Sequence, residues 1–323
     1  MKVHLQHRSD PDYSAKTPLS AKEHFANISE LLSLAIASAK VKKLTVYEKD
    51  GPKNMRTVIH PLLRASTANF KSAMLTAVGK HEGRPVLDEV TQPGLVGSVD
   101  RRTMQLIPGV AWTCRNGVLL MDEFRIRRKS DDWTVFLKLL EDQTYTRKVA
   151  LFSAPMKLEE LYMGRDDLYL RQENGQIEMK TRFACIIATM KRFETHTGPE
   201  FKAFVNRTIP YEFAFNLDEL ERVLKGGELL KLKDFNPEPE VEIQKEEWFK
   251  IVNFVRKNLP MLTPADTIAS QENLARTCGD IARIHAIQGN VDWRFAKKII
   301  NWKIDVYKRI GIWQRRQKEA VKT

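Results

Sequence analysis

Two adjacent carboxylates follow an apolar run in the segment GVLLMDEF, residues 117–124. A continuous apolar run predicts a strand buried on both faces of a parallel sheet. In open α/β sheets, ligands bind beyond the carboxyl ends of the strands, where Asp122 and Glu123 are expected to lie. An aspartate there suits Mg²⁺ and a glutamate suits an attacking water, so the pair predicts metal-assisted phosphoryl transfer. A strand that simply ends in solvated acids is the alternative interpretation.

A phosphate-binding loop is expected upstream of these carboxylates, between a strand and a helix. The candidate is ASTANFKS, residues 65–72, which leads into a helical pattern. Lys71 would reach the β- and γ-phosphates of a nucleotide, and Ser72 would ligate Mg²⁺. The helix N-terminus would add amide groups and the positive end of its dipole.

The loop departs from the G-x-x-x-x-G-K-[ST] pattern of P-loops. Ala65 and Phe70 stand in the places of the two glycines, which permit positive φ and close approach of the backbone to phosphate. The loop is therefore interpreted as a degenerate P-loop. An ordinary surface lysine at a helix start is the alternative for Lys71.

The elements that must position these residues alternate along the chain. Helical spacing of apolar residues predicts helices at residues 20–43, 71–81, 131–142, 246–259, 270–288 and 292–313. Apolar runs predict strands at residues 57–65, 117–121, 145–152 and 182–189. This alternation predicts an α/β fold with a mainly parallel sheet. Pro61 indicates an irregular start or an edge position for the first strand.

The chain divides into three parts by composition. We expect an N-terminal arm and helix at residues 1–55, an α/β core at residues 56–224, and a linker with a small α-helical lid and basic tail at residues 225–323. The segment NPEPEVEIQ, residues 236–244, is predicted to be linker. The dipeptide NG within residues 153–180 predicts a turn.

Composition limits the partners and the compartment. The 323 residues include 53 Lys and Arg against 41 Asp and Glu, a net charge of +12, which favours a polyanionic partner such as nucleic acid. The three cysteines are far apart without zinc-site spacing, and we expect them to be buried and reduced. No secretory signal and no run long enough for a membrane span occurs, so we expect a cytoplasmic protein, or a nuclear one in a eukaryote.

The ordered series of degenerate P-loop, carboxylate pair and later motifs resembles the AAA+ ATPases. It is most similar to the motor module of the minichromosome maintenance (MCM) helicases and their MoxR-type and magnesium-chelatase relatives. The resemblance covers residues 57–224 and a lid after Pro264. GVLLMDEF resembles the Walker B strand, residues 95–112 a helix-2 insertion, residues 153–180 a pre-sensor-1 hairpin, and RFACIIATM the sensor-1 strand.

The resemblance implies an ATPase that uses ATP and Mg²⁺. The implied nucleotide-binding residues are Ala65, Asn69, Lys71, Ser72, Asp122 and Arg276, with Ser72 and Asp122 on the metal. The implied catalytic residues are Glu123 for the attacking water, Thr189 as sensor and Arg207 as arginine finger. The sensor-2 arginine is expected at Asn273, and Arg276 lies one turn later. At the sensor-1 position the family prefers asparagine, where this chain has Thr189.

The family also implies a hexameric ring, with Arg207 reaching the γ-phosphate held by a neighbouring subunit. An arginine in trans stabilises the charge that spreads over the transferring phosphoryl group. A solvent-facing arginine on a strand is the alternative for Arg207. For Arg283 we favour a solvated helix face, which is also the alternative for Arg276.

Four basic residues in the two insertions are implied to contact DNA phosphates. They are Arg101, Arg102, Lys157 and Arg165. Acidic residues at 159, 160, 166 and 167 lie in the same hairpin, and the DNA-binding domain that precedes the motor in MCM proteins has no counterpart in residues 1–55. Three functions therefore remain open: a DNA-translocating, helicase-like ATPase, a MoxR-like protein remodeller, and a ring or scaffold that does not hydrolyse ATP.

The stripe of Trp293, Ile300 and Tyr307 in the last predicted helix is predicted to pack against the rest of the fold.

Overall fold

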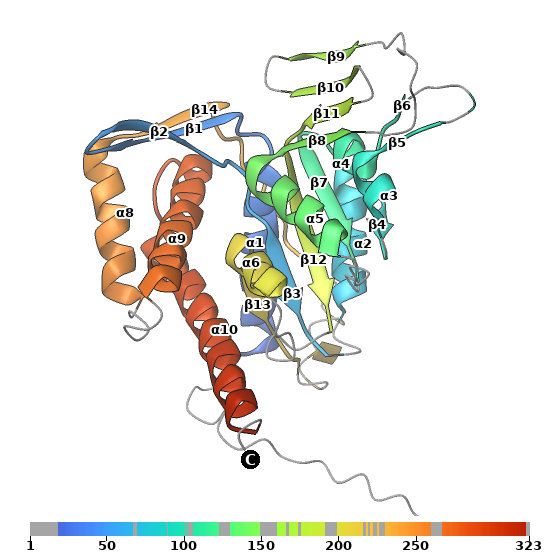
Figure 1. The fold of residues 1–323 in the computed structure, drawn as a ribbon. Helices are drawn as coiled ribbons and strands as arrows, with labels where there is room; N and C mark the ends of the chain where they lie inside the picture. The colour runs from blue at the N-terminus through green and yellow to red at the C-terminus, as the bar shows by residue number, and fades with distance from the viewer. Residues whose placement is uncertain are drawn as a thin grey trace, which may run out of the picture.

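The structure is a computed structural model of the chain. It describes residues 19–66, 70–88, 90–100, 102, 106–122, 130–148, 160–165, 168–173, 176–190, 199–215, 218, 220–221, 225, 230–259 and 267–320. Its centre is a parallel sheet between two helical layers (Figure 1). Within the described ranges, every helix is too short or too polar to cross a membrane.

The central sheet has five strands, all parallel. They are β3 (Pro61–Arg64), β4 (Val86–Leu87), β7 (Gly117–Met121), β12 (Phe183–Thr189) and β13 (Ile209–Glu212). In space the order is β13-β3-β12-β7-β4, that is, fifth, first, fourth, third and second along the chain. This topology confirms the predicted α/β class with a parallel sheet and is compatible with a P-loop-like core.

Alternate residues of each central strand point to opposite faces, as the pleat requires. In β7, Val118 and Leu120 join one apolar cluster, while Leu119 and Met121 join the other. All five β7 residues are buried. Burial on both faces explains why this strand reads as a continuous apolar run.

Helices cover both faces of the sheet. Helices α1 (Ala21–Ser38) and α2 (Lys71–Glu82) pack on one face. Helices α5 (Ser130–Asp142) and α6 (Pro199–Arg207) pack on the other, with the short helices α3 (Gln92–Val96) and α4 (Val110–Thr113). The predicted division assigns residues 1–55 to an arm and helix that precede the core. Helix α1 falls in this range, but it packs on the central sheet as one of its layers. A capping box of Ser20 and Glu23 starts it.

A second, three-stranded sheet joins the chain that precedes the central sheet to a strand that follows it. It consists of β2 (Gly51–Met55), β1 (Lys43–Glu48) and β14 (Glu240–Ile243), with β1 antiparallel to β2 and parallel to β14. The prediction that residues 236–244 are only linker is therefore wrong. The pairing with β1 is a long-range contact that composition does not reveal.

The C-terminal helices follow this strand. They are α8 (Lys245–Asn258), α9 (Thr267–Gln288) and α10 (Trp293–Ala320), close to the predicted ranges. With β1 and β14 they form a third apolar cluster, which includes Ile251, Ile281 and Ile300. The predicted stripe of α10 is confirmed, because Trp293 and Tyr307 also pack against apolar clusters.

Two insertions project from the end of the sheet at which the parallel strands begin (Figure 1). One is the hairpin of β5 (Ser98–Val99) and β6 (Leu106–Ile107). The other is an antiparallel sheet of β8 (Thr144–Lys148), β11 (Gln176–Lys180), β10 (Leu168–Glu173) and β9 (Glu160–Arg165). The NG turn is confirmed, since Glu173 pairs with Gln176. The strand predicted at residues 145–152 is β8, and it joins this sheet rather than the parallel one.

Pro61 opens β3, which lies between β13 and β12. An inner strand accepts proline at its first residue, so the irregular start was the correct interpretation of the two. The three cysteines are free and buried, as predicted.

Candidate functional site

The carboxyl ends of β3, β12 and β7 lie at one edge of the parallel sheet. Ile187 of β12 is level with Leu62 of β3 and with Met121 of β7. Arg64, Thr189 and Asp122 therefore come together at this edge. Because neighbouring strands are about 4.8 Å apart, β3 and β7 are separated by about 10 Å, with Thr189 on the strand between them.

The loop after β3 carries Lys71 back toward the strand. The Nζ of Lys71 donates hydrogen bonds to the carbonyl oxygens of Ala65 and Ser66, each at 2.9 Å, and the residue is buried. Ala65 is fully buried, and its N–H donates to the carbonyl of Thr189 at 3.3 Å. A lysine ammonium held over a loop in this way is a positive charge at the edge where ligands of α/β sheets bind.

Phe70 keeps the backbone conformation that a glycine would adopt. It stands at the N-cap of α2 with φ of 58° and ψ of 15°, in the left-handed region that is costly for a bulky residue. Its side chain packs against the cluster that includes the α1 and α2 residues, which holds the residue in place. The side chain departs from the P-loop pattern, while the positive φ that the glycine permits is retained.

Asp122 directly follows β7 and is buried, and its N–H donates to the carbonyl of Leu87 at 2.8 Å. Thr189 ends β12 and is also buried. Ser72 is exposed in the first turn of α2. Within the described part of the chain, no three His, Cys, Asp or Glu side chains gather as a metal site. Mg²⁺ is commonly held by one or two protein oxygens together with substrate phosphates, and Ser72 and Asp122 are the described candidates.

Several predicted residues are not brought to this edge or are not described. Asn69, Arg101, Glu123 and Lys157 lie outside the described residues. Arg102 is exposed in the β5–β6 connection, where its N–H donates to Asp100 Oδ1 at 2.8 Å. Arg165 ends β9, in the insertion sheet. The DNA-contact residues that the structure describes therefore belong to the two insertions.

Arg207 and Arg276 lie together at the opposite edge of the sheet, where the parallel strands begin. Arg207 is the last residue of α6, immediately before β13. Both arginines reach one carboxylate oxygen, Oε2 of Glu141, at 3.0 Å from Arg207 Nε and 2.5 Å from Arg276 Nη1. Arg276 is thus placed with Arg207 rather than with the Lys71 of its own chain.

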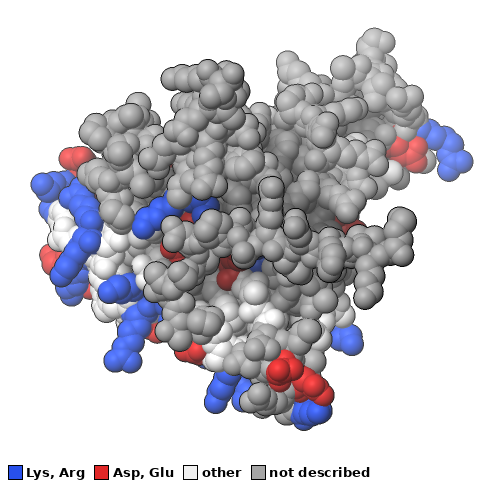
Figure 2. Space-filling model, turned by 90° about the horizontal axis from the view of Figure 1, so that it is seen from below, with Lys and Arg blue, Asp and Glu red and all other residues white. Residues whose placement is uncertain are grey.

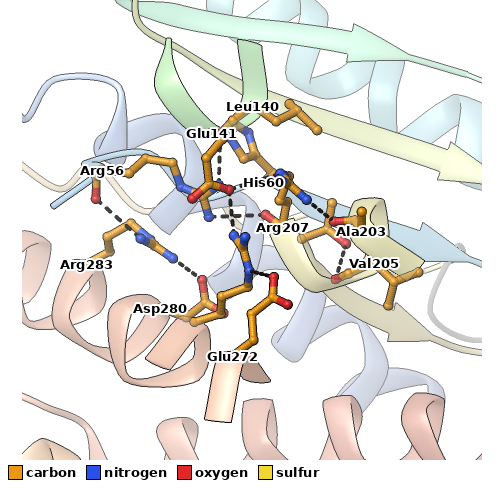
Figure 3. A network of polar contacts seen from close by, with 12 residues as sticks. Arg56, His60, Leu140, Glu141, Ala203, Val205, Arg207, Glu272, Asp280 and Arg283 are labelled. Carbon is orange, nitrogen blue, oxygen red and sulfur yellow. Dashed lines mark hydrogen bonds and ion pairs between the residues drawn. The ribbon is translucent and has the colours of Figure 1, made fainter. Parts of the chain in front are cut away.

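A third arginine completes this group, which we call the arginine cluster: Arg56, Arg207 and Arg276 around Glu141. Figure 3 labels Arg56, Arg207 and Glu141 of this cluster. Arg56 Nη1 lies 3.8 Å from Glu141 Oε2. Its guanidinium also donates to the carbonyls of Leu140 and Arg207, at 2.8 and 3.2 Å. Burial, and next the charge of Arg283, lower the pKa of Arg56 to about 9. Burial raises the pKa of Glu141, but Arg56 and Arg276 outweigh it and hold this pKa below its ordinary value.

The same polar region continues between α9 and α10. Asp280 is buried and pairs with Arg283 of its own helix and with Lys303 of α10. The expectation that Arg283 lies on a solvated helix face is therefore wrong, because its side chain is only 4% exposed. Burial and the charge of Arg276 lower the pKa of Arg207.

Sequence reasoning missed Arg56, Glu141, Asp280 and Lys303. Lys303 had a signal, since it lies four residues after Ile299 and three before Val306, which are both buried. Arg56 and Glu141 had none, because Arg56 lies between β2 and β3, Glu141 lies in the last turn of α5, and both find their partners more than 60 residues away along the chain.

The comparisons with known proteins add no family. No protein-family model matches the chain, and no curated protein is significantly similar to it in sequence. What the fold and the site define is an α/β protein with a five-stranded parallel sheet, compatible with a P-loop-like core.

Proposed function

We propose that the chain is an AAA+ ATPase that binds ATP and Mg²⁺ at the edge formed by Lys71, Asp122 and Thr189. The observation that carries this proposal is the position of Lys71 and Asp122 at the same edge of one parallel sheet, after its first and third strands. The five-stranded parallel sheet is compatible with a P-loop-like core. ATP would supply the transferable phosphoryl group, and the residues at this edge would hold its phosphates.

The residues at this edge fit a phosphate group in chemistry. Lys71 supplies a positive charge, and the N-terminus of α2 supplies amide groups and the positive end of a helix dipole. The buried carboxylate of Asp122 would bind the metal that accompanies the phosphates. Glu123, next along the chain, would orient the attacking water.

Nucleotide binding is tested by Lys71→Ala, with Lys80→Ala as the matched control. Lys80 is an exposed lysine near the other end of the same helix. We expect Lys71→Ala to weaken binding of a fluorescent ATP analogue at least about tenfold and Lys80→Ala to leave it unchanged. Equal binding by both variants would contradict the proposal.

Hydrolysis is a separate question, because Phe70 stands where a P-loop has glycine. This observation favours, as a second candidate, a ring or scaffold that binds nucleotide without hydrolysing it. Phosphate release by the wild type and by Glu123→Gln distinguishes the two. Turnover that the variant loses supports the ATPase, and a wild type that binds without turnover supports the scaffold.

For the substrate we propose DNA, on the basis of the net charge of +12 and the MCM-like order of motifs. On the face at the carboxyl ends of the strands, basic and acidic side chains of the described residues are interspersed (Figure 2). The proposed DNA contacts are those that the resemblance implies, in the insertions at the other end of the sheet. The affinity for a DNA oligonucleotide should fall steeply between 50 and 200 mM salt, by about a thousandfold if about six phosphates are contacted. Absence of salt-dependent binding would favour the MoxR-like remodeller of proteins.

A further inference from the structure

Five basic side chains gather at the edge of the central sheet where the parallel strands begin. They lie in the connections from α1 to β1, from α2 to β4 and from α4 to β7, and at the first residue of β1. We call them the amino-edge patch: Lys40, Lys42, Lys43, Arg84 and Arg115. The three lysines are exposed and the two arginines are half-buried. None of the five belongs to the insertions, so the DNA contacts proposed above do not include them.

A buried arginine ties two of these connections together. Arg182 lies directly before β12. Its guanidinium donates to the carbonyl oxygens of Ala39 and Lys42, at 3.1 and 3.4 Å. It also donates to Asn116 Oδ1 at 2.6 Å. The turn that carries Lys42 therefore lies beside Asn116, which is the neighbour of Arg115 in the chain.

The third connection reaches the same place through Arg84. Its Nη1 donates to the carbonyl of Thr113 at 2.6 Å, and its guanidinium lies beside Gly117, the first residue of β7. Arg115 lies between these two residues along the chain, and its guanidinium lies over the ring of Trp112, 5.0 Å from the ring centre. Both arginines are thus held in place by contacts within the fold, which lowers the entropic cost of binding a ligand.

The described part of the chain does not neutralise this patch. None of its five side chains forms an ion pair with a described carboxylate. Exposed lysines elsewhere do so, as in the pairs Lys53–Glu48, Lys233–Glu30 and Lys250–Glu247. Positive charges that lie close together without partners repel one another, so the patch is expected to attract a polyanion.

The patch adjoins the insertion sheet. Strand β11 ends at Lys180, and two residues connect it to β12. One of them, Thr181, donates from its Oγ1 to the carbonyl of Ala111 in α4 at 3.1 Å. The base of the insertion sheet therefore lies against the helix that precedes Arg115. Because both insertions project from this end of the central sheet (Figure 1), DNA that they hold would lie close to the patch.

We infer that the amino-edge patch is a second binding surface for the DNA backbone, outside the two insertions. The inference rests on the proposal that DNA is the substrate, and it does not depend on nucleotide binding at Lys71. Lysine and arginine side chains contact phosphates without reading base edges, so the patch binds DNA of any sequence. Since it is joined to the insertions in one rigid fold, each surface raises the effective concentration of DNA at the other.

The test measures how a fluorescent duplex of mixed sequence binds in the absence of nucleotide, by anisotropy between about 50 and 200 mM salt. The triple variant Lys40→Gln/Lys42→Gln/Lys43→Gln removes three charges of the patch. If each lysine contacts one phosphate, the slope of log Kd against log salt concentration should fall by about 2.7, at about 0.9 per contact. The Kd at the lowest salt concentration should rise at least about tenfold.

The matched control is Lys22→Gln/Lys257→Gln/Lys297→Gln. These lysines are exposed on α1, α8 and α10 and form no ion pair with a described carboxylate, so the net charge changes equally. Equal slopes for the two triple variants would overturn the inference, because they would reduce the effect to overall charge. Equal Tm values show that both variants fold. If the patch variant has a lower Tm, Lys40→Gln/Lys42→Gln replaces it, because it leaves β1 unchanged and should lower the slope by about 1.8.

The variant Arg102→Gln/Arg165→Gln separates the patch from the insertions. Weaker binding by the patch variant supports the inference, whether or not this insertion variant also binds more weakly. If only the insertion variant binds more weakly, the inference is overturned and the DNA proposal remains. A wild-type chain that binds no duplex overturns both. In that case, binding to phosphatidylserine vesicles that only the patch variant loses would assign the patch to an anionic membrane surface instead.

Discussion

His60 is a histidine that the fold keeps uncharged. It is fully buried; its Nδ1 accepts the N–H of Cys185 at 2.9 Å, and its Nε2 donates to the carbonyl of Leu140 at 3.1 Å. Both ring nitrogens are used, so the neutral form fits the site and an added proton does not. Burial, and next the charge of Arg56, lower the pKa of His60 well below 6.5.

The lowered pKa of His60 predicts that the protein loses stability in mild acid. The unfolded chain takes up the proton near pH 6.5 while the folded chain does not, so protonation favours unfolding. The free energy of unfolding should be fully retained above about pH 6.5 and should fall below it, by at most about 1.4 kcal/mol per pH unit from this group. His60→Gln should be less stable at pH 7.5 and should show a shallower dependence between pH 5 and 6.5 in urea titrations. Parallel curves would contradict the assignment, since His285, which shifts in the same direction, is present in both proteins.

At the scale of elements, β14 shows how a segment that resembles linker becomes structural. Its burial alternates, with Glu240 and Glu242 exposed and Ile243 buried. It pairs with β1 over four residues, from Lys43–Glu240 to Val46–Ile243. This parallel pairing connects the chain that precedes the central sheet with the helices that follow it.

Ile243→Ala should therefore destabilise the protein. Ile243 is 1% exposed within the third apolar cluster, and removal of a buried isoleucine side chain costs about 2–5 kcal/mol. Glu240→Ala, on the exposed side of the same strand, should change the free energy of unfolding by less than about 0.5 kcal/mol. Chemical denaturation of both variants measures the difference, and similar values would argue against packing by β14.

At the scale of the whole molecule, a polar network joins the sheet domain to the C-terminal helices. The arginine cluster links the region before β3, the end of α5, the end of α6 and α9. Asp280 extends it to α10 through Lys303. Burial raises the pKa of Asp280, but Lys303 and Arg283 outweigh it, so this pKa lies below the ordinary value. The aspartate therefore remains charged and holds two buried cations.

Asp280→Asn should lower the stability of the whole molecule against unfolding, rather than that of one part. It would leave Lys303 and Arg283 buried without their carboxylate, which costs about 3–5 kcal/mol. We expect far-UV circular dichroism and tryptophan fluorescence to report one coincident transition at a lower Tm. The control Asp234→Asn, at an 89% exposed side chain, should unfold like the wild type. Two separated transitions would show that the helices unfold independently of the sheet.

Local pattern determined much of the fold. Continuous apolar runs predicted β7 and β12, and helical stripes predicted α2, α5, α8, α9 and α10, because burial on a sheet or helix face is imposed on neighbouring residues. It also placed Lys71 and Asp122 after their strands. That only β12 separates β3 from β7, and hence how far apart these two residues lie, depends on the strand order, which only the tertiary structure decided.

The tertiary structure alone decided which distant residues meet. Arg56, Glu141, Arg207 and Arg276 come from four separate segments and follow no common spacing, so no periodicity could group them. The pairing of β14 with β1 joins residues almost 200 positions apart. Such contacts arise when folded helices and strands pack together, and the pattern of residues along the sequence carries little information about them.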